Sequence, residues 1–199
     1  MPPASAPVDY IAATRDAYAA LGYSAYRWVR SEEPPPWAVL RRPFEECRIA
    51  LIASGGIYVA GQIAFHFKDD TSFRRIPTDV ATEELRATHF AYDLTDARRD
   101  PNVVFPIDTL RRLAPAMPSN IASASTIPPS KSGRAPARSR VHSMDTLAAE
   151  CGRIGGLTRH AFTFMGGIYS SRRVRDELAP AIARAVVDEG ADAALLVPV

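Results

Sequence analysis

The sequence predicts an α/β fold in which helices flank a mostly parallel sheet. Three short apolar runs have the character of buried strands: Arg48–Ala53, His160–Phe164 and Ala193–Val199. A longer segment, Arg172–Glu189, has the apolar content of a packed helix and turns at Gly190 before the last run. Because strands that alternate with helices favour a parallel sheet, we expect these runs to lie side by side.

The composition is that of an ordinary globular protein. With 199 residues, 47% of them hydrophobic and 23% charged, we expect a single α/β domain, residues 1–199. A net charge of +2 gives no reason to expect nucleic acid or an anionic membrane as a partner. The first residues, Met1–Ser5, lack the basic and apolar regions typical of a secretory signal, so none is expected, and no apolar run approaches the roughly 20 residues that span a bilayer. Cys47 and Cys151 form no metal-ligand pattern, so we predict a cytoplasmic protein without a metal site.

The N-terminal part is predicted to contain a helix and the first central strand. The segment Asp9–Leu21 is helix-like, with Asp9 as its N-cap and Gly22 as its stop. The strand Arg48–Ala53 follows after a proline-rich turn, and a second apolar piece, Ile57–Ala60, comes shortly after it.

The middle of the chain is more polar. We expect Lys68–Asp79 to be a loop, Glu83–Ala87 a short helical turn, and Thr88–Tyr92 a strand. A helix is predicted from Ile107 onward, ending at Pro115. Residues 117–144 are rich in serine and proline, basic and poor in apolar side chains, so this insert is predicted to be a disordered, solvated linker.

Ser54, Gly55 and Gly56 form the first candidate site, directly after the strand Arg48–Ala53. Two glycines permit positive φ and close backbone approach, so the loop can cradle an anion or a carboxylate. A plain tight turn explains the same residues. The loop lacks the GxGxxG pattern of dinucleotide-binding proteins.

His89, Tyr92 and Asp93 form the second candidate site. In an extended segment His89 and Asp93 share one face, and a histidine beside a carboxylate can act as an oriented acid or base. The alternative is a histidine at a strand end whose ring is satisfied by a neighbouring carbonyl.

Arg98 and Gly166 are further candidates for substrate binding. An arginine grips a carboxylate through two parallel hydrogen bonds, although ion pairing with nearby aspartates also explains Arg98. Gly166 follows the strand His160–Phe164, where it forms either a pocket wall or a turn. Cys47 and Cys151 could serve as the paired thiols of a cofactor-independent racemase, but neither follows the carboxyl end of a predicted strand.

Five separated blocks of the chain, taken in order, carry a family resemblance. The blocks are Arg48–Ile57, Phe73–Pro77 with His89–Asp93, Ala97–Pro106, Arg153–Leu157 with Phe162–Gly166, and Asp192–Val199. Together they resemble the selenoprotein B family of the glycine, sarcosine, betaine and D-proline reductases. The resemblance covers Arg48 to Val199 apart from the insert.

The resemblance implies reduction of a small amino acid with electrons from thiols, in a protein with reductase partner subunits. In such enzymes a selenolate or thiolate attacks a substrate carbon, and a pyruvoyl group in a partner chain activates the amine. The selenocysteine or cysteine is expected directly after the strand that matches Leu195–Val199, where this sequence ends. The chain would then be the N-terminal part of a larger family domain.

Two explanations for the missing nucleophile are a true fragment and a UGA selenocysteine codon after Val199. The alternative to a reductase is a non-catalytic remnant or a small-ligand-binding module. On the reductase interpretation His89 is the candidate acid/base, and the substrate-binding candidates are Ser54, Gly55, Gly56, Tyr92, Asp93, Arg98 and Gly166. A parallel sheet that stops after a strand exposes an apolar edge, so we predict an isolated chain that is poorly soluble or forms homo-oligomers.

Overall fold

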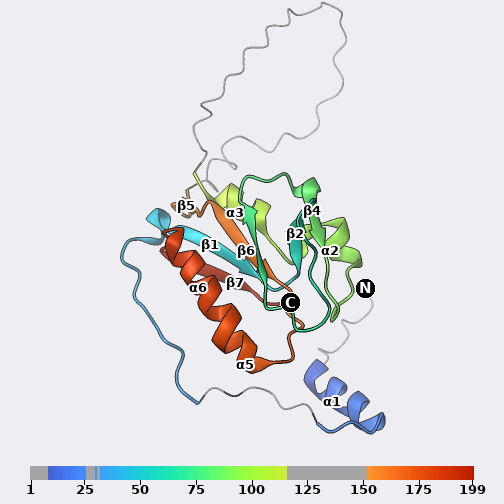
Figure 1. The fold of residues 1–199 in the computed structure, drawn as a ribbon. Helices are drawn as coiled ribbons and strands as arrows, with labels where there is room; N and C mark the ends of the chain where they lie inside the picture. Colours follow the sequence, from blue (N-terminus) through green and yellow to red (C-terminus); the bar gives the residue numbers. More distant parts are fainter. Residues whose placement is uncertain (1–8, 26–29, 31, 116–151) are drawn as a thin grey trace, which may run out of the picture. The chain divides into compact units, whose positions relative to one another are not determined.

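The computed structural model describes residues 9–25, 30, 32–115 and 152–199. The chain divides into two compact units, Met1–Trp37 and Ala38–Val199 (Figure 1). The first unit contains α1 (Tyr10–Ala20), whose N-cap Asp9 accepts a hydrogen bond of 3.0 Å from the Ala12 amide. Gly22 follows with φ of 78°, so the predicted helix and its stop are confirmed.

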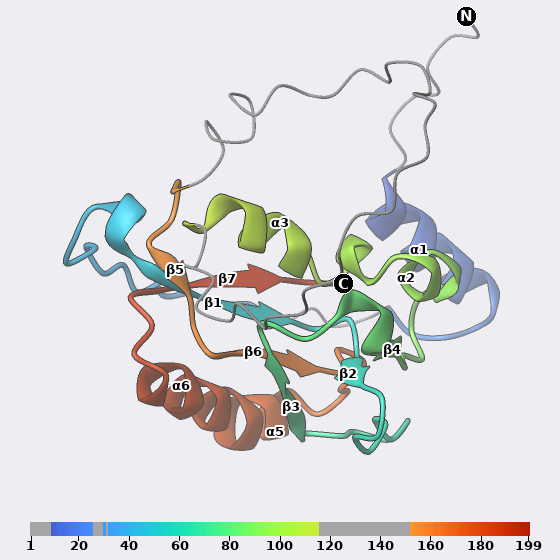
Figure 2. The ribbon, with the colours of Figure 1, turned by 90° about the horizontal axis from the view of Figure 1, so that it is seen from above.

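The second unit is built on a five-stranded sheet (Figure 2): β1 (Arg48–Ala53), β3 (Phe73–Pro77), β5 (Gly156–Leu157), β6 (His160–Phe164) and β7 (Ala193–Val197). β1 is central. β7 pairs along one of its edges, while β5 and β6 pair one after the other along the opposite edge, all in parallel. β3 runs antiparallel to β6. The sheet is therefore mixed but mostly parallel.

Helices cover both faces of this sheet (Figure 2). α3 (Ile107–Leu113) lies on one face, and α5 (Ser171–Arg173) and α6 (Ala179–Asp188) lie on the other. Side chains alternate along β1, since Leu51 packs in one apolar cluster with α3 and Ile52 packs in a second cluster with α6. The predicted α/β fold with flanking helices is confirmed.

The C-terminal helix contains a local irregularity. A π-helical segment, η4 (Val174–Leu178), joins α5 to α6, and Pro180 lies just beyond it. Proline lacks an amide hydrogen and its ring clashes with the carbonyl four residues earlier, so a wider turn at this point relieves the clash. The helix predicted over Arg172–Glu189 is confirmed, and Gly190 ends it with φ of 68°.

Smaller elements connect the main ones. A two-stranded antiparallel sheet joins β2 (Ile57–Val59) and β4 (Leu85–Ala87), and α2 (Thr95–Arg99) follows. Three short 3₁₀ turns complete the described elements: η1 (Phe44–Glu46), η2 (Thr82–Glu84) and η3 (Pro101–Val103).

The prediction that Lys68–Asp79 is a loop was wrong, because this segment contains β3. Ile76 on this strand is fully buried, while Arg74 lies with its guanidinium 4.3 Å above the ring centre of Phe65. The arginines made the segment appear polar, but an edge strand keeps charged side chains on its outer face.

The strand predicted over Thr88–Tyr92 was also misplaced. The strand is β4, three residues earlier, and the helical turn is confined to Thr82–Glu84. After Ala87 the chain bends, because the Ala91 amide donates to the His89 ring at 3.0 Å. Because of this bend, His89 and Tyr92 lie in a loop after β4 and not on a strand.

Other predictions fall outside what the structure tests. The insert 117–144 and Cys151 lie outside the described residues. The single-domain interpretation of residues 1–199 therefore stays a prediction. Within the described ranges, no helix has both the length and the apolar character needed to cross a bilayer.

The outer edge of the sheet carries exposed leucines. β7 pairs with β1 alone among the described strands, and Leu195 and Leu196 are 39% and 69% exposed. Neighbouring strand residues point to opposite faces, so both faces of β7 are open. An uncovered apolar edge of this kind recruits other chains.

We expect residues 1–199 to elute as homo-oligomers on size-exclusion chromatography with light scattering. Leu196→Lys places a charge on the edge strand and should shift the protein toward monomer. Val187→Lys is the matched control, because Val187 is 73% exposed on α6, which is a helix and has no strand edge to pair with another chain. A monodisperse monomer of the unmodified chain would contradict the prediction.

Candidate functional site

The connections after β1 and β6 leave the sheet toward opposite faces. After β1 the chain passes through β2, whose Ile57 packs in the apolar cluster that also contains α3 residues, and after β6 it passes to the face that carries α5 and α6 (Figure 2). In open α/β sheets such a topological switch point, at the carboxyl ends of the strands, is where ligands bind. Six of the predicted site residues meet there, and we call them the switch-point cluster: Ser54, Gly55, Gly56, His89, Tyr92 and Gly166.

Backbone hydrogen bonds join the two glycine loops of the cluster. The Gly166 amide donates to the Ser54 carbonyl at 2.9 Å, and the Gly56 amide donates to the Phe164 carbonyl at 3.0 Å. Gly56 has φ of 69°, and a Cβ atom there would lie 2.0 Å from the Thr88 carbonyl oxygen. At Gly55 a Cβ atom would lie 2.8 Å from the Val104 side chain. Close packing therefore requires glycine at both positions.

His89 reaches the cluster from the bend after β4. Its side chain is 5% exposed, and burial lowers the pKa of the imidazole, so the ring is held neutral. The Ala91 amide lies 3.0 Å from Nδ1, and the Gly166 amide lies 3.2 Å from Nε2.

A neutral imidazole carries one hydrogen and cannot accept at both nitrogens. The ring therefore accepts from one of these two amides and carries its hydrogen on the other nitrogen.

Tyr92 supports the same cluster, whereas Asp93 does not pair with His89. The Tyr92 hydroxyl donates to the Gly55 carbonyl at 2.8 Å, and its ring centre lies 4.5 Å from that of His89. Burial raises the pKa of Tyr92, and the charge of Arg98 partly opposes this rise. Asp93 instead accepts hydrogen bonds from the Thr95 amide at 2.9 Å and hydroxyl at 2.7 Å. These bonds lower the pKa of Asp93 and fix the start of α2.

Arg98 lies on α2 at the edge of the cluster. Its neighbour Arg99 forms an ion pair with Asp96 at 3.5 Å. Local ion pairing of this kind was the alternative to substrate binding that the sequence offered for the arginines of this segment. The Arg98 guanidinium makes no ion pair with the described residues, and its positive charge only partly opposes the burial that raises the pKa of Tyr92. Arg98 is thus exposed on α2, the helix that follows Tyr92 and Asp93.

Ser54 ties the end of β7 to the cluster. Its amide donates to the Val197 carbonyl at 3.0 Å, and its hydroxyl accepts a hydrogen bond of 2.9 Å from the Val199 amide. This contact was not predicted, because it requires the register of β1 against β7. Two features of the sequence hint at this contact. Ser54, which has a hydroxyl group, follows β1, and Pro198, which lacks an amide hydrogen, follows β7.

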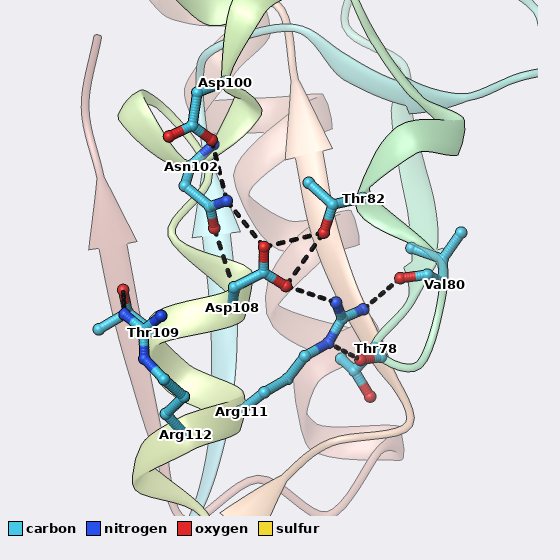
Figure 3. A network of polar contacts seen from close by, with 9 residues as sticks. All are labelled: Thr78, Val80, Thr82, Asp100, Asn102, Asp108, Thr109, Arg111 and Arg112. Carbon is cyan, nitrogen blue, oxygen red and sulfur yellow. Dashed lines mark hydrogen bonds and ion pairs between the residues drawn. The ribbon is translucent and has the colours of Figure 1, made fainter. Parts of the chain in front are cut away.

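A network of polar contacts around the start of α3 was also missed (Figure 3). The Asp108 carboxylate accepts hydrogen bonds from Thr82 at 2.9 Å, from Asn102 at 2.8 Å and from Arg111 at 2.7 Å. Burial alone would raise the pKa of Asp108, but these bonds outweigh it and hold the pKa below its usual value. The network fixes the start of α3, and Val104 in the segment before α3 packs against Gly55.

Two other features lie away from the switch point. An open cavity of about 1070 Å³ lies at the opposite ends of β1 and β6, lined by residues that include Arg48, Arg111 and Arg159. Cys47 precedes β1, is fully buried, and has its thiol pKa raised by burial. Neither feature contacts the cluster.

The fold and the cluster define an α/β protein with its candidate site at the carboxyl ends of parallel strands. The chain is 28% identical over 175 residues to the D-proline reductase subunit gamma of Acetoanaerobium sticklandii. The match covers 88% of this chain and 58% of the relative, so the chain spans little more than half of that protein's length. This similarity confirms the resemblance to the amino-acid reductases. No family model and no solved structure gives a significant match.

Proposed function

We propose that this chain is part of a reductase that acts on a small amino acid or an N-methylated relative, with electrons from thiols. The observation that carries the proposal is the similarity to a D-proline reductase subunit over 88% of the chain. The candidate substrates are glycine, sarcosine, betaine and D-proline. Partner subunits and a cytoplasmic setting, where thiols stay reduced, belong to the same proposal.

The proposed nucleophile is a selenocysteine or cysteine that follows Val199. It attacks the substrate carbon that bears nitrogen, so a carbon–selenium or carbon–sulfur bond forms and the carbon–nitrogen bond breaks. The electron pair of the broken bond goes to nitrogen, which takes up a proton. A first thiolate then attacks the selenium or sulfur, so its bond to carbon breaks and the carbon keeps the electron pair and takes up a proton. A second thiol displaces the nucleophile, and the two thiols end as a disulfide. A pyruvoyl group in a partner subunit would supply the carbonyl that activates the amine.

The geometry supports this placement of the nucleophile. The Val199 amide is bound to the Ser54 hydroxyl, so a residue after Val199 would begin at the switch-point cluster. His89 would act as the acid/base group: its neutral imidazole would take the proton of the attacking selenol or thiol, and the imidazolium so formed would pass that proton to the departing nitrogen. Gly55, Gly56, Gly166, Tyr92 and Asp93 would form the walls, and Ser54 would act through the segment that it holds.

A thiol-dependent reduction assay tests the proposal. The protein is produced with the segment encoded after Val199 and with its partner subunits, and is supplied with dithiothreitol and each of the four substrates. We expect reduction of at least one. A protein that binds one of them without reducing it would contradict the proposal and would be a ligand-binding module. Sequencing the codon after Val199 adds an independent test, because any stop codon with no in-frame α/β continuation contradicts it.

Arg98 is the proposed partner of the substrate carboxylate. Arg98→Gln should raise KM about 10- to 100-fold with a smaller change in kcat, since a charge-assisted bidentate contact contributes about 1.5–3 kcal/mol. Arg99→Gln is the matched control, because Arg99 is the next residue on α2 and is paired with Asp96. Equal effects of the two substitutions on KM would argue against this role.

A further inference from the structure

The open cavity at the amino ends of β1 and β6 has no part in the proposed function. Its volume is about 1070 Å³, and it is lined by the turn after β3, the end of α3 and the segment around β5. Small-molecule sites in proteins span roughly 300 to 1,000 Å³. The space is therefore large enough for a small organic molecule.

One wall of this cavity is held in place by Arg111 and Thr78 (Figure 3). The Arg111 guanidinium donates to the Thr78 carbonyl at 2.7 Å and to the Asp108 carboxylate at 2.7 Å. The Thr78 hydroxyl donates to the Thr158 carbonyl at 2.8 Å, so the turn after β3 is tied both to α3 and to the segment before β6. Because two of these bonds hold backbone carbonyls, the cavity is already formed without a ligand.

The charged side chains of the lining leave an excess of positive charge. They are Arg48, Asp79, Arg111 and Arg159. Arg111 is neutralised by its ion pair with Asp108. Arg48 and Arg159 make no ion pair within the part of the chain that the structure describes. These two arginines exceed the one remaining carboxylate, Asp79, by a single positive charge.

The acidic residues just outside the lining are already paired. The Glu189 carboxylate contacts the His160 ring at 2.6 Å and the Arg75 guanidinium at 3.6 Å. The Asp192 carboxylate contacts the Arg42 guanidinium at 3.3 Å. Neither carboxylate is therefore left to neutralise the arginines of the cavity.

Much of the remaining lining is apolar, and it comprises Pro77, Val80, Ala81, Ala114, Pro115 and Leu157. Apolar walls favour a ligand with a hydrocarbon body. A single excess positive charge matches one carboxylate, which arginine binds through charge-assisted hydrogen bonds. A phosphate monoester carries about two negative charges at neutral pH and would leave one of them unpaired.

We propose that this cavity binds a small carboxylic acid with an apolar body, with Arg48 and Arg159 as the partners of its carboxylate. The site goes beyond the proposed reductase function and does not depend on it. It lies at the opposite ends of β1 and β6 from the switch-point cluster.

A titration of residues 1–199 with acetate, butyrate and hexanoate, followed by amide shifts in two-dimensional NMR, tests the site. Each buried methylene should raise the affinity about three- to fourfold, so we expect a gain of about tenfold at each step of the series. The shifts should centre on Ala81, Leu157 and Arg159. Hexylammonium has the same apolar body and the opposite charge, so it should not bind.

Arg159→Gln should weaken hexanoate binding about tenfold or more, because a charge-assisted hydrogen bond is lost. The matched control is Arg153→Gln, since Arg153 is an exposed arginine just before β5 that does not line the cavity. This control should leave the Kd within about twofold. Both arginines are exposed, so neither substitution should prevent folding.

Four results would overturn the inference. They are equal affinities along the carboxylate series, equal effects of the two substitutions, inorganic phosphate that binds as tightly as hexanoate, and shifts confined to the switch-point cluster. The first three would show attraction to surface charge alone. The fourth would show that the carboxylate binds at the other end of the sheet.

Discussion

Replacing Gly56 with alanine is expected to cost about 3–5 kcal/mol of unfolding free energy or to prevent folding. Gly56 has φ of 69°, a conformation that disfavours any residue with a Cβ atom by about 1–2 kcal/mol. The added Cβ would also lie 2.0 Å from the Thr88 carbonyl oxygen, which is backbone. The Thr88 amide is bound to the Gly56 carbonyl at 3.0 Å, so neither segment can move independently.

Gly61→Ala separates the two parts of this cost. Gly61 has φ of 93°, but a Cβ atom there would have no neighbour within 4 Å. We therefore expect Gly61→Ala to cost only about 1–2 kcal/mol, which is the conformational part alone. Urea denaturation followed by circular dichroism measures both variants. Equal losses would show that the Thr88 carbonyl yields without cost and that the two glycine loops are not rigidly packed.

The main frame of the sheet was predictable because its strands are short apolar runs. β1, β6 and β7 are each short runs rich in apolar residues, a pattern typical of buried strands. The apolar helix between β6 and β7 ends at a glycine, which is also recognisable in the sequence. β3 was not predictable in the same way. β3 is an edge strand with two arginines, and Ile76 is its one fully buried residue. A single buried apolar position gives no alternating pattern that could be recognised in the sequence.

That six of the predicted residues lie together followed from the sequence more directly than the contacts between them did. Glycine loops after parallel strands point to the switch point from sequence alone. The pairing of His89 with Asp93 was expected from a strand period of two, but the bend after β4 breaks that period. Asp93 then starts α2, and the nearest partner of the His89 ring is backbone. Contacts that depend on strand register, such as Ser54 with Val199, are not encoded in any local pattern.

His89 is expected to make the fold less stable as the pH falls below about 6.5. Burial lowers the pKa of the folded imidazole below its unfolded value, so the unfolded chain binds the proton more readily. The contribution of neutral His89 to the free energy of unfolding is therefore fully present above the pKa of the unfolded chain. It is lost as the pH falls from that value toward the folded pKa.

This loss can be separated from that of the carboxylates. The pKa values of Asp70, Asp108 and Glu189 are lowered in the fold, so their contribution is present above their unfolded pKa and is lost below about pH 4. The window from about pH 6.5 to 4.5 is the one in which His89 should dominate. Urea midpoints taken across this window measure the slope.

Two substitutions at the same place identify the group. His89→Asn keeps a side-chain acceptor for the Ala91 amide but does not titrate, so it should flatten the slope between pH 6.5 and 4.5. Tyr92→Phe is the matched control, since it removes the bond to Gly55 and nothing that titrates in this window. It should lower stability by about 1 kcal/mol equally at each pH.

His89→Ala should be the most damaging of these changes. It removes the acceptor of the Ala91 amide and leaves a buried space beside Tyr92, at a cost of about 2–4 kcal/mol. If His89→Asn keeps the slope of the unmodified chain, the imidazole is not held neutral at the switch point. In that case the acid/base role proposed for a neutral His89 fails.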